Sequence, residues 1–171
     1  GTGALESNDF FMVERGGQLL SAEVSGFTPS APYLTITTNV GQPGLNGIIG
    51  TLQVTNARGV NGVPAQIRNR SSGAVLYLPQ NGSVVLTTSF CVSNTIHMYG
   101  QFSDFKFTNM KGLRSIGTQN YSKDDWSSLV PTPVSDFGKS MFQGCENLIA
   151  FDINLPAKSL AHFMDGCSSF D

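Results

Sequence analysis

The sequence predicts a mainly β protein, in which an antiparallel β-sandwich is followed by a short segment of repeats. Short stretches of alternating apolar and polar residues, rich in Thr, Val and Ile, recur between residues 33 and 99. Glycine-containing turn pairs separate these stretches. An eight-residue pattern then occurs twice near the C-terminus, at Met141–Leu148 and at Phe163–Phe170. The three observations together indicate strands first and stacked repeats second.

The composition narrows the class of protein. The chain has 171 residues, 19 glycines, only 13% charged residues and a formal net charge of −2. This length suits one domain or two small ones, and the low charge is typical of extracellular or virion β proteins. A nucleic-acid groove built on phosphate neutralisation is not expected at this charge balance. No apolar run is long enough to predict a membrane span.

Residues 1–25 are expected to form a flexible arm and an anchoring β-hairpin. A bulky apolar stretch at 10–13 meets Gly16-Gly17, a two-residue turn signal, and the chain returns through 19–24. An isolated hairpin is marginal in water, so we expect it to pack on another surface. The predicted assembly-anchor residues are Phe10, Phe11, Val13, Arg15, Leu19 and Leu20.

Residues 26–101 are expected to form the β-sandwich. Pro29 and Pro32 mark a linker, because proline interrupts both helices and central strands. Turn pairs such as Asn61-Gly62 and Asn81-Gly82 then separate the strands. Six short strands at this spacing predict an immunoglobulin-like sandwich. The predicted strands are Tyr33–Val40, Ile48–Thr55, Ala65–Arg68, Ala74–Leu78, Ser83–Thr88 and Thr95–Tyr99.

Residues 102–171 are expected to form the repeat segment. The two copies begin 22 residues apart, and each has a Phe and Met pair, x-Gly-Cys, two polar residues and a large apolar residue. A fixed period near twenty residues indicates units that bury their faces on one another. Leu113-x-x-Ile116 matches Leu148-x-x-Phe151, so we interpret residues 101–116 as a degenerate first repeat. The predicted ladder residues are Met141, Phe142, Cys145, Leu148, Phe151, Phe163, Met164, Cys167 and Phe170.

Local patterns predict the elements inside this segment. Residues 117–135 are polar and are expected to form a loop or one short helix. Ser135 or Asp136 is expected to cap a helical turn that runs to Phe142. A strand is predicted at Leu148–Ile153, and a short helix at Lys158–Met164. The repeat pattern calls for another strand after Asp171, so we expect either more chain there or a covering partner.

The three cysteines, Cys91, Cys145 and Cys167, do not form a disulfide framework by count or spacing. Because Cys145 and Cys167 occupy the same repeat position, they are interpreted as small buried apolar side chains of a ladder. His97 and His162 are not suitably spaced around the thiols for a metal site. No metal and no cofactor are expected.

The sequence supports a catalytic function less well than a structural one. Alternation along its strand places His97 opposite Ile96 and Met98, which predicts a solvent-facing histidine, while His162 is interpreted as a packing or surface residue. Asp124-Asp125 could suggest a carboxylate pair for sugar chemistry, but adjacent carboxylates are more often a helix start or a solvated turn. Neither these nor Asp104 follow a calcium-loop pattern. No catalytic residue is assigned.

Two resemblances add to this interpretation. Residues 102–171, through Met141-Phe142-x-Gly144-Cys145-x-x-Leu148 and its second copy, resemble the BspA-like leucine-rich repeats of bacterial and phage-encoded surface proteins. That family implies surface display and adhesion without enzymatic activity. Phe170 departs from the usual leucine. The run from Asp9 to Gly17 is similar to the opening of many tailed-phage structural proteins, which docks the chain onto the virion.

The sequence therefore predicts a non-enzymatic structural or adhesion component of a tailed-phage virion, such as a tail-fibre, fibre-like or decoration protein. Its expected partners are other virion proteins, further copies of the chain, and a host cell-surface glycan or protein. The alternative is a secreted bacterial cell-surface adhesin. The N-terminus shows no secretory signal, so an adhesin would need a signal removed upstream of Gly1, whereas a virion protein leaves by lysis.

Overall fold

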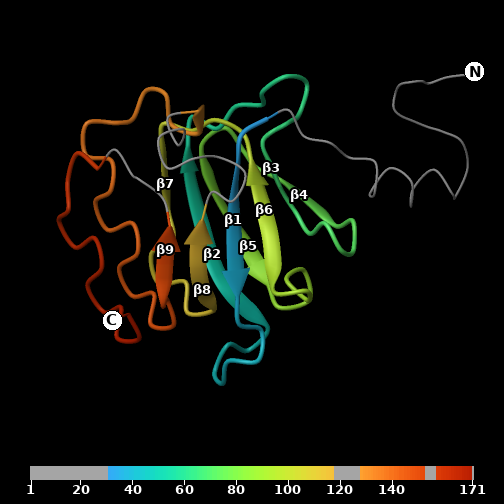
Figure 1. Ribbon diagram of the computed structural model, residues 1–171, viewed down its shortest axis with the longest axis vertical. Helices are drawn as coiled ribbons and strands as arrows, with labels where there is room; N and C mark the ends of the chain where they lie inside the picture. Colours follow the sequence, from blue (N-terminus) through green and yellow to red (C-terminus); the bar gives the residue numbers. More distant parts are fainter. Residues whose placement is uncertain (1–30, 118–127, 153–156, 171) are drawn as a thin grey trace, which may run out of the picture.

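A computed structural model describes residues 31–117, 128–152 and 157–170, and these residues are mainly β. Their strands form two sheets (Figure 1). The expected arm and hairpin, with Phe10, Phe11, Val13, Arg15, Leu19 and Leu20, lie outside the described residues, as do Asp124 and Asp125.

The larger sheet of the described part has six strands and the smaller has three. All pairings between these strands are antiparallel except that of β8 with β9, which is parallel. The order in the larger sheet is β4 (Val75–Tyr77), β3 (Gln66–Arg68), β6 (Thr95–Tyr99), β1 (Tyr33–Thr38), β8 (Leu113–Gly117) and β9 (Ala150–Asp152). The order in the smaller sheet is β5 (Gly82–Thr87), β2 (Ile48–Thr55) and β7 (Asp104–Lys106).

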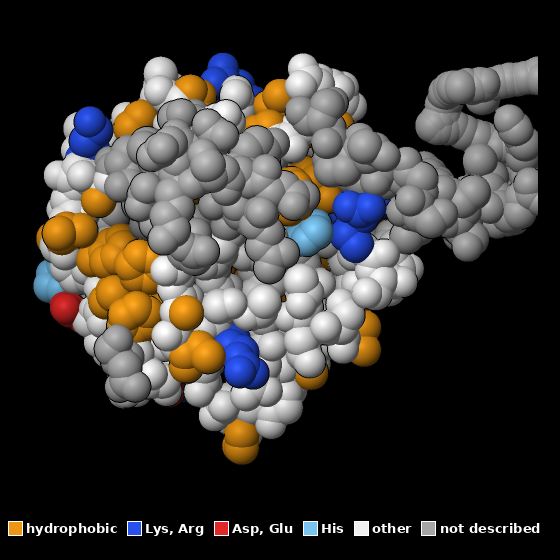
Figure 2. Space-filling model, viewed as in Figure 1, with side chains coloured by type: hydrophobic (Ala, Val, Ile, Leu, Met, Phe, Trp, Pro, Cys, Tyr) orange, Lys and Arg blue, Asp and Glu red, His pale blue; other side chains and the backbone are white. Residues whose placement is uncertain are grey.

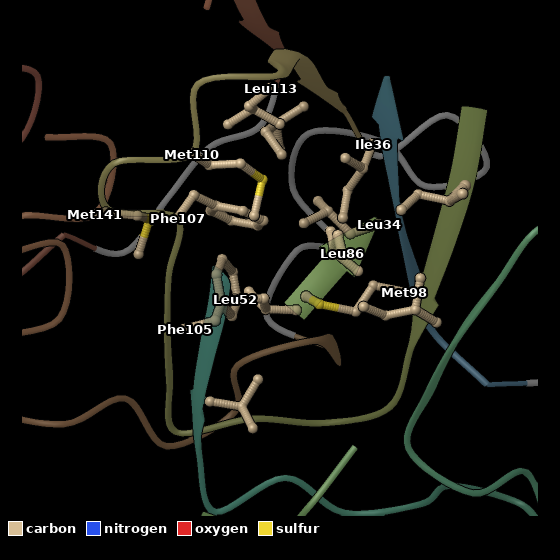
Figure 3. Close-up of a cluster of buried hydrophobic side chains, with 14 of the residues drawn as sticks. Leu34, Ile36, Leu52, Leu86, Met98, Phe105, Phe107, Met110, Leu113 and Met141 are labelled. Atoms are coloured by element: carbon tan, nitrogen blue, oxygen red, sulfur yellow. The ribbon is translucent and has the colours of Figure 1, made fainter. Parts of the chain in front are cut away.

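Alternation of side chains along the strands explains the core. In β2, Leu52 and Val54 are buried while Thr51 and Gln53 are exposed, because successive side chains point to opposite faces. Leu34 and Ile36 of β1 meet Leu52, Leu86 of β5 and Met98 of β6 in one hydrophobic cluster (Figure 3). The two sheets therefore share a single core.

The six strands predicted between residues 33 and 99 are all present, and Ile48–Thr55 and Thr95–Tyr99 have the predicted bounds. The larger sheet continues across the expected boundary between residues 101 and 102. Strand β8 pairs with β1 on one side, through Ile36 and Ile116, and with β9 on the other. The repeat segment and the preceding strands thus have a sheet in common.

The two helices predicted after residue 134 are wrong. Residues 135–142 form successive turns, and residues 158–164 form a bend followed by turns, with no helix in either segment. Their backbone cannot continue a helix, because Gly138, Ser140 and His162 have positive φ angles of 104°, 56° and 54°. The predicted strand at Leu148–Ile153 is present as the shorter β9.

No helix among the described residues is long and apolar enough to cross a bilayer.

Candidate functional site: three stacked turns

Three segments of the chain repeat the same local conformation, and we call them turn 1 (residues 107–113), turn 2 (142–148) and turn 3 (164–170). Each begins with an N–H···O=C bond from the fourth residue to the first, of 2.9 to 3.1 Å, followed by one from the seventh to the fourth, of 3.1 to 3.2 Å. The third residue of each is left-handed. These residues are Asn109, Gly144 and Gly166, with φ angles of 62°, 76° and 81°.

Backbone hydrogen bonds connect each turn to the next. Phe107 and Asn109 donate N–H groups to the carbonyl oxygens of Met141 and Gln143, at 2.7 and 2.6 Å. The same pattern of backbone hydrogen bonds recurs between turns 2 and 3, where alternate residues are the donors. Ser140, Phe142 and Gly144 donate to Ala161, Phe163 and Asp165 at 2.9, 2.9 and 2.7 Å. The turns are therefore held in a fixed register, which is the arrangement of a stacked repeat.

The repeated cysteines belong to this register. The Cys145 thiol donates to the carbonyl oxygen of Phe107, and the Cys167 thiol donates to that of Phe142, both at 3.0 Å. Burial raises the pKa of the Cys145 thiol to about 12, and burial also raises the pKa of Cys167. Both side chains are therefore protonated hydrogen-bond donors at neutral pH and poor nucleophiles.

Aromatic rings line the inside of the stack. The rings of Phe107 and Phe142 are stacked with centroids 5.7 Å apart, and Phe142 stacks in turn on Phe151 at 5.6 Å. Phe151 stacks on Phe170 at 5.6 Å, while Phe163 meets Phe142 edge-on at 5.3 Å. Geometries of this kind stabilise aromatic pairs beyond their burial alone. They link turn 1 to turn 3 through the interior.

The left-handed residues form a column in which the backbones approach closely. A Cβ atom on Gly144 would collide with Oδ1 of Asn109 and lie 3.3 Å from its Cα. A Cβ atom on Gly166 would lie 3.4 Å from Cα of Gly144, which is ordinary contact. Glycine at position 144 is thus required both by φ and by the closeness of the turn before it.

The spacing between turns is unequal. Turn 2 follows turn 1 after 35 residues, and turn 3 follows turn 2 after 22. Within the longer connection, Leu129 and Val130 are buried, and Phe137 packs edge-on against Phe105 of β7 at 5.6 Å. The Phe102 N–H donates to the carbonyl oxygen of Leu129 at 2.8 Å. The described part of the connection between turns 1 and 2 therefore packs against the sheets.

Burial decreases along the stack. Met141, Phe142, Cys145 and Leu148 are fully buried, whereas Phe151, Phe163, Met164, Cys167 and Phe170 are only partly buried. Leu160 and Ile149 are 69% and 46% exposed. Apolar side chains gather in Figure 2 on the side of the molecule where Figure 1 draws β9 and the C-terminal residues. The first four of these predicted ladder residues belong to the core cluster and the other five pack against it, so the end of the stack is its most open part.

Turn 1 is the part of the site that sequence reasoning largely missed. Leu113-x-x-Ile116 was matched to Leu148-x-x-Phe151, and the parallel pairing of Ile116 with Phe151 has this register. Residues 101–116 were interpreted as a degenerate first repeat, but Phe107, Asn109 and Met110 were not aligned with the Phe, Gly and Cys positions of the later copies. The available signal was the spacing Phe-x-Asn-Met-x-x-Leu, in which Asn replaces Gly and Met replaces Cys.

A second cluster lies on the face of the larger sheet opposite the core. His97 is on the face opposite Ile96 and Met98, as predicted, and it is partly exposed there. Its ring lies 4.6 Å from that of Tyr33, and its Nδ1 atom is 3.3 Å from the Tyr99 hydroxyl. Arg70 donates to the same hydroxyl at 3.1 Å. Burial first, and the charge of Arg70 second, lower the pKa of His97.

The other titratable residues considered from the sequence lie apart from this cluster. Exposed His162 pairs with Asp165 at 2.6 Å on the surface of the stack. Asp104 is buried on β7, where desolvation raises its pKa and Lys106, 3.4 Å away, opposes that shift. No group of three or more potential metal ligands occurs among residues 31–117, 128–152 and 157–170.

Comparisons with known proteins add no relative. No family model, curated protein or solved structure matches the chain.

Proposed function

We propose that the chain is a non-enzymatic structural protein that displays the stacked turns as a surface, as a component of a tailed-phage virion anchored through its N-terminal residues. Its fold is proposed to be an immunoglobulin-like β-sandwich extended by leucine-rich-repeat turns. The similarity of residues 9–17 to virion-docking segments and the low charge of the chain support this location.

The observation that carries the proposal is the continuity of the turns with the sheets. Strand β8 is shared, because it pairs with β1 and with β9, and Figure 3 shows Phe107, Met110 and Leu113 in one cluster with Leu34 and Leu52. A stack built on a sheet is held rigidly, which suits a surface for recognition, because a rigid surface loses less entropy on binding.

The chemistry of the stack favours display over catalysis. The thiols of turns 2 and 3 donate to backbone carbonyls and have raised pKa values, which is the opposite of an activated cysteine. The exposed residues near the end of the stack include the apolar Leu160 and Ile149, and apolar patches are characteristic of contact surfaces. The proposed partners are other virion proteins, copies of the chain, and a host cell-surface glycan or protein.

Deleting residues 1–25 tests the proposal. The shortened chain should keep the circular dichroism spectrum of a folded β protein and should fail to join particles assembled by a producing phage. The matched control carries Glu23→Gln, a change in the same region but outside the predicted anchor residues, and should be incorporated normally. Incorporation of the shortened chain would overturn the anchoring. Recovery of the full chain on bacterial surfaces and not in particles would favour the adhesin.

A further inference from the structure

The outer edge of turn 3 continues the series of contacts that joins the earlier turns. Residues 140, 142 and 144 each donate an N–H group to the following turn. The residues at the same positions one repeat later are His162, Met164 and Gly166. Their N–H groups have no acceptor among the described residues. The edge therefore presents three donors at alternate residues, spaced as in an extended strand.

The carbonyl groups and apolar side chains at this edge also repeat those by which turn 2 contacts turn 3. The Phe142 carbonyl accepts the thiol of Cys167 in addition to the N–H of Cys145. The equivalent Met164 carbonyl accepts the N–H of Cys167, which leaves its second lone pair for a donor from outside. Phe163 and Phe170 are only partly buried, and Leu160 is 69% exposed. His162 repeats the left-handed backbone of Ser140.

We propose that this edge is a docking surface for one more polypeptide turn of the same repeat. The occupant has a row of three carbonyl oxygens at alternate residues, an apolar pair that covers Phe163 and Phe170, and a thiol or hydroxyl that donates to the Met164 carbonyl. These are the features that turn 3 offers to turn 2. The surface continues an interface already made twice within the chain, and it does not depend on the proposed virion location.

Turns 2 and 3 of a second copy do not fit this edge. The carbonyls of Ala161, Phe163 and Asp165 already accept bonds from turn 2, and those of Met141 and Gln143 accept bonds from turn 1. A second copy would bring another set of three donors against the first. Turns 2 and 3 of a second copy therefore cannot offer the required row of acceptors.

The proposal is tested by extending the full chain. A copy of residues 150–170 is fused after Asp171, which places the second Phe163 at the 22-residue period, and its cysteine is changed to serine, which keeps a hydroxyl donor but is not alkylated. The control carries the same added residues in shuffled order. Amide hydrogen exchange of residues 162–166 and alkylation of Cys167 are measured in both, together with the sedimentation of the unextended chain over a wide concentration range.

In the matched extension, exchange at Met164 and Gly166 should slow by a factor of about ten or more, and alkylation of Cys167 should slow in parallel. The shuffled extension should leave both rates unchanged. Equal rates in the two extended chains would overturn the proposal. It would also be overturned if the unextended chain dimerised with protection of residues 162–166, because a second copy would then be the occupant.

Discussion

The Cys145 thiol donates a hydrogen bond to the carbonyl oxygen of Phe107, a residue 38 positions earlier in the chain. The Cys167 thiol makes the same bond to Phe142, which occupies the position of Phe107 in the following turn. Cysteine thus combines two properties at this position. It fills a small apolar space, and it satisfies a second lone pair of a buried carbonyl.

Replacing this thiol should destabilise the protein. Cys145→Ser puts a more polar and smaller group in a fully buried site, and we expect the free energy of unfolding to fall by roughly 1–3 kcal/mol. Cys167→Ser is the matched control, because Cys167 makes the same bond but is only partly buried, so its loss should be smaller. Urea denaturation measures both. Equal losses for the two variants would show that burial does not determine the effect.

Gly144→Ala should be more damaging than Gly166→Ala. Both substitutions place a Cβ atom on a left-handed residue, which costs about 1–2 kcal/mol. Only at residue 144 does the Cβ atom also collide with Asn109, so a total loss of about 2–4 kcal/mol is expected there. Thermal and urea unfolding of the pair provide the comparison. A reversed order would contradict the stacking of turn 2 on turn 1.

Phe142 should be the most sensitive aromatic residue of the stack, because it is fully buried and meets Phe107, Phe151 and Phe163. Phe142→Ala is expected to lower the free energy of unfolding by about 3–5 kcal/mol. Leu160→Ala, at an exposed position nearby, should change it by less than about 0.5 kcal/mol. Chemical denaturation distinguishes the two, and a small effect of Phe142→Ala would show that the turns do not share the core.

Lowering the pH should reduce the free energy of unfolding, because His97 becomes protonated more readily in the unfolded chain. Its pKa is lowered in the folded state, so the unfolded chain binds a proton more readily. The contribution of neutral His97 is therefore present above its ordinary pKa of 6.5 and is lost as the pH falls below that value. Urea midpoints between pH 5 and 8 should fall toward acid in the wild type and fall less in His97→Gln. The same slope in both proteins would exclude His97 as the source.

Sequence alternation was sufficient for the strands because burial on one face leaves a period of two. Ile48–Thr55 has that period together with flanking turn residues, and its bounds were correct. The helices predicted at 135–142 and 158–164 are absent for a physical reason. Ser140 and His162 are left-handed without being glycine, and alternate N–H groups at 140–144 bond to the following turn. Neither property has a local sequence signal.

The stack itself was partly predictable. The Gly-Cys pairs at 144 and 166 fix the 22-residue period, whereas turn 1 lies 35 residues earlier and has Asn109 and Met110 in their place. An asparagine can adopt the left-handed conformation, and a methionine can fill the space of a buried cysteine, so the geometry is kept while the pattern is lost. The sharing of β8 between both parts depends on contacts distant in sequence.

Mass spectrometry of purified tailed-phage particles tests the proposed function most directly. The account predicts that peptides of this chain, including some from residues 1–25, are recovered from intact particles in constant proportion to the major virion proteins through successive purification steps. Absence of the chain from purified particles, with recovery from the bacterial cell surface or the culture medium, would contradict the proposed role in the virion.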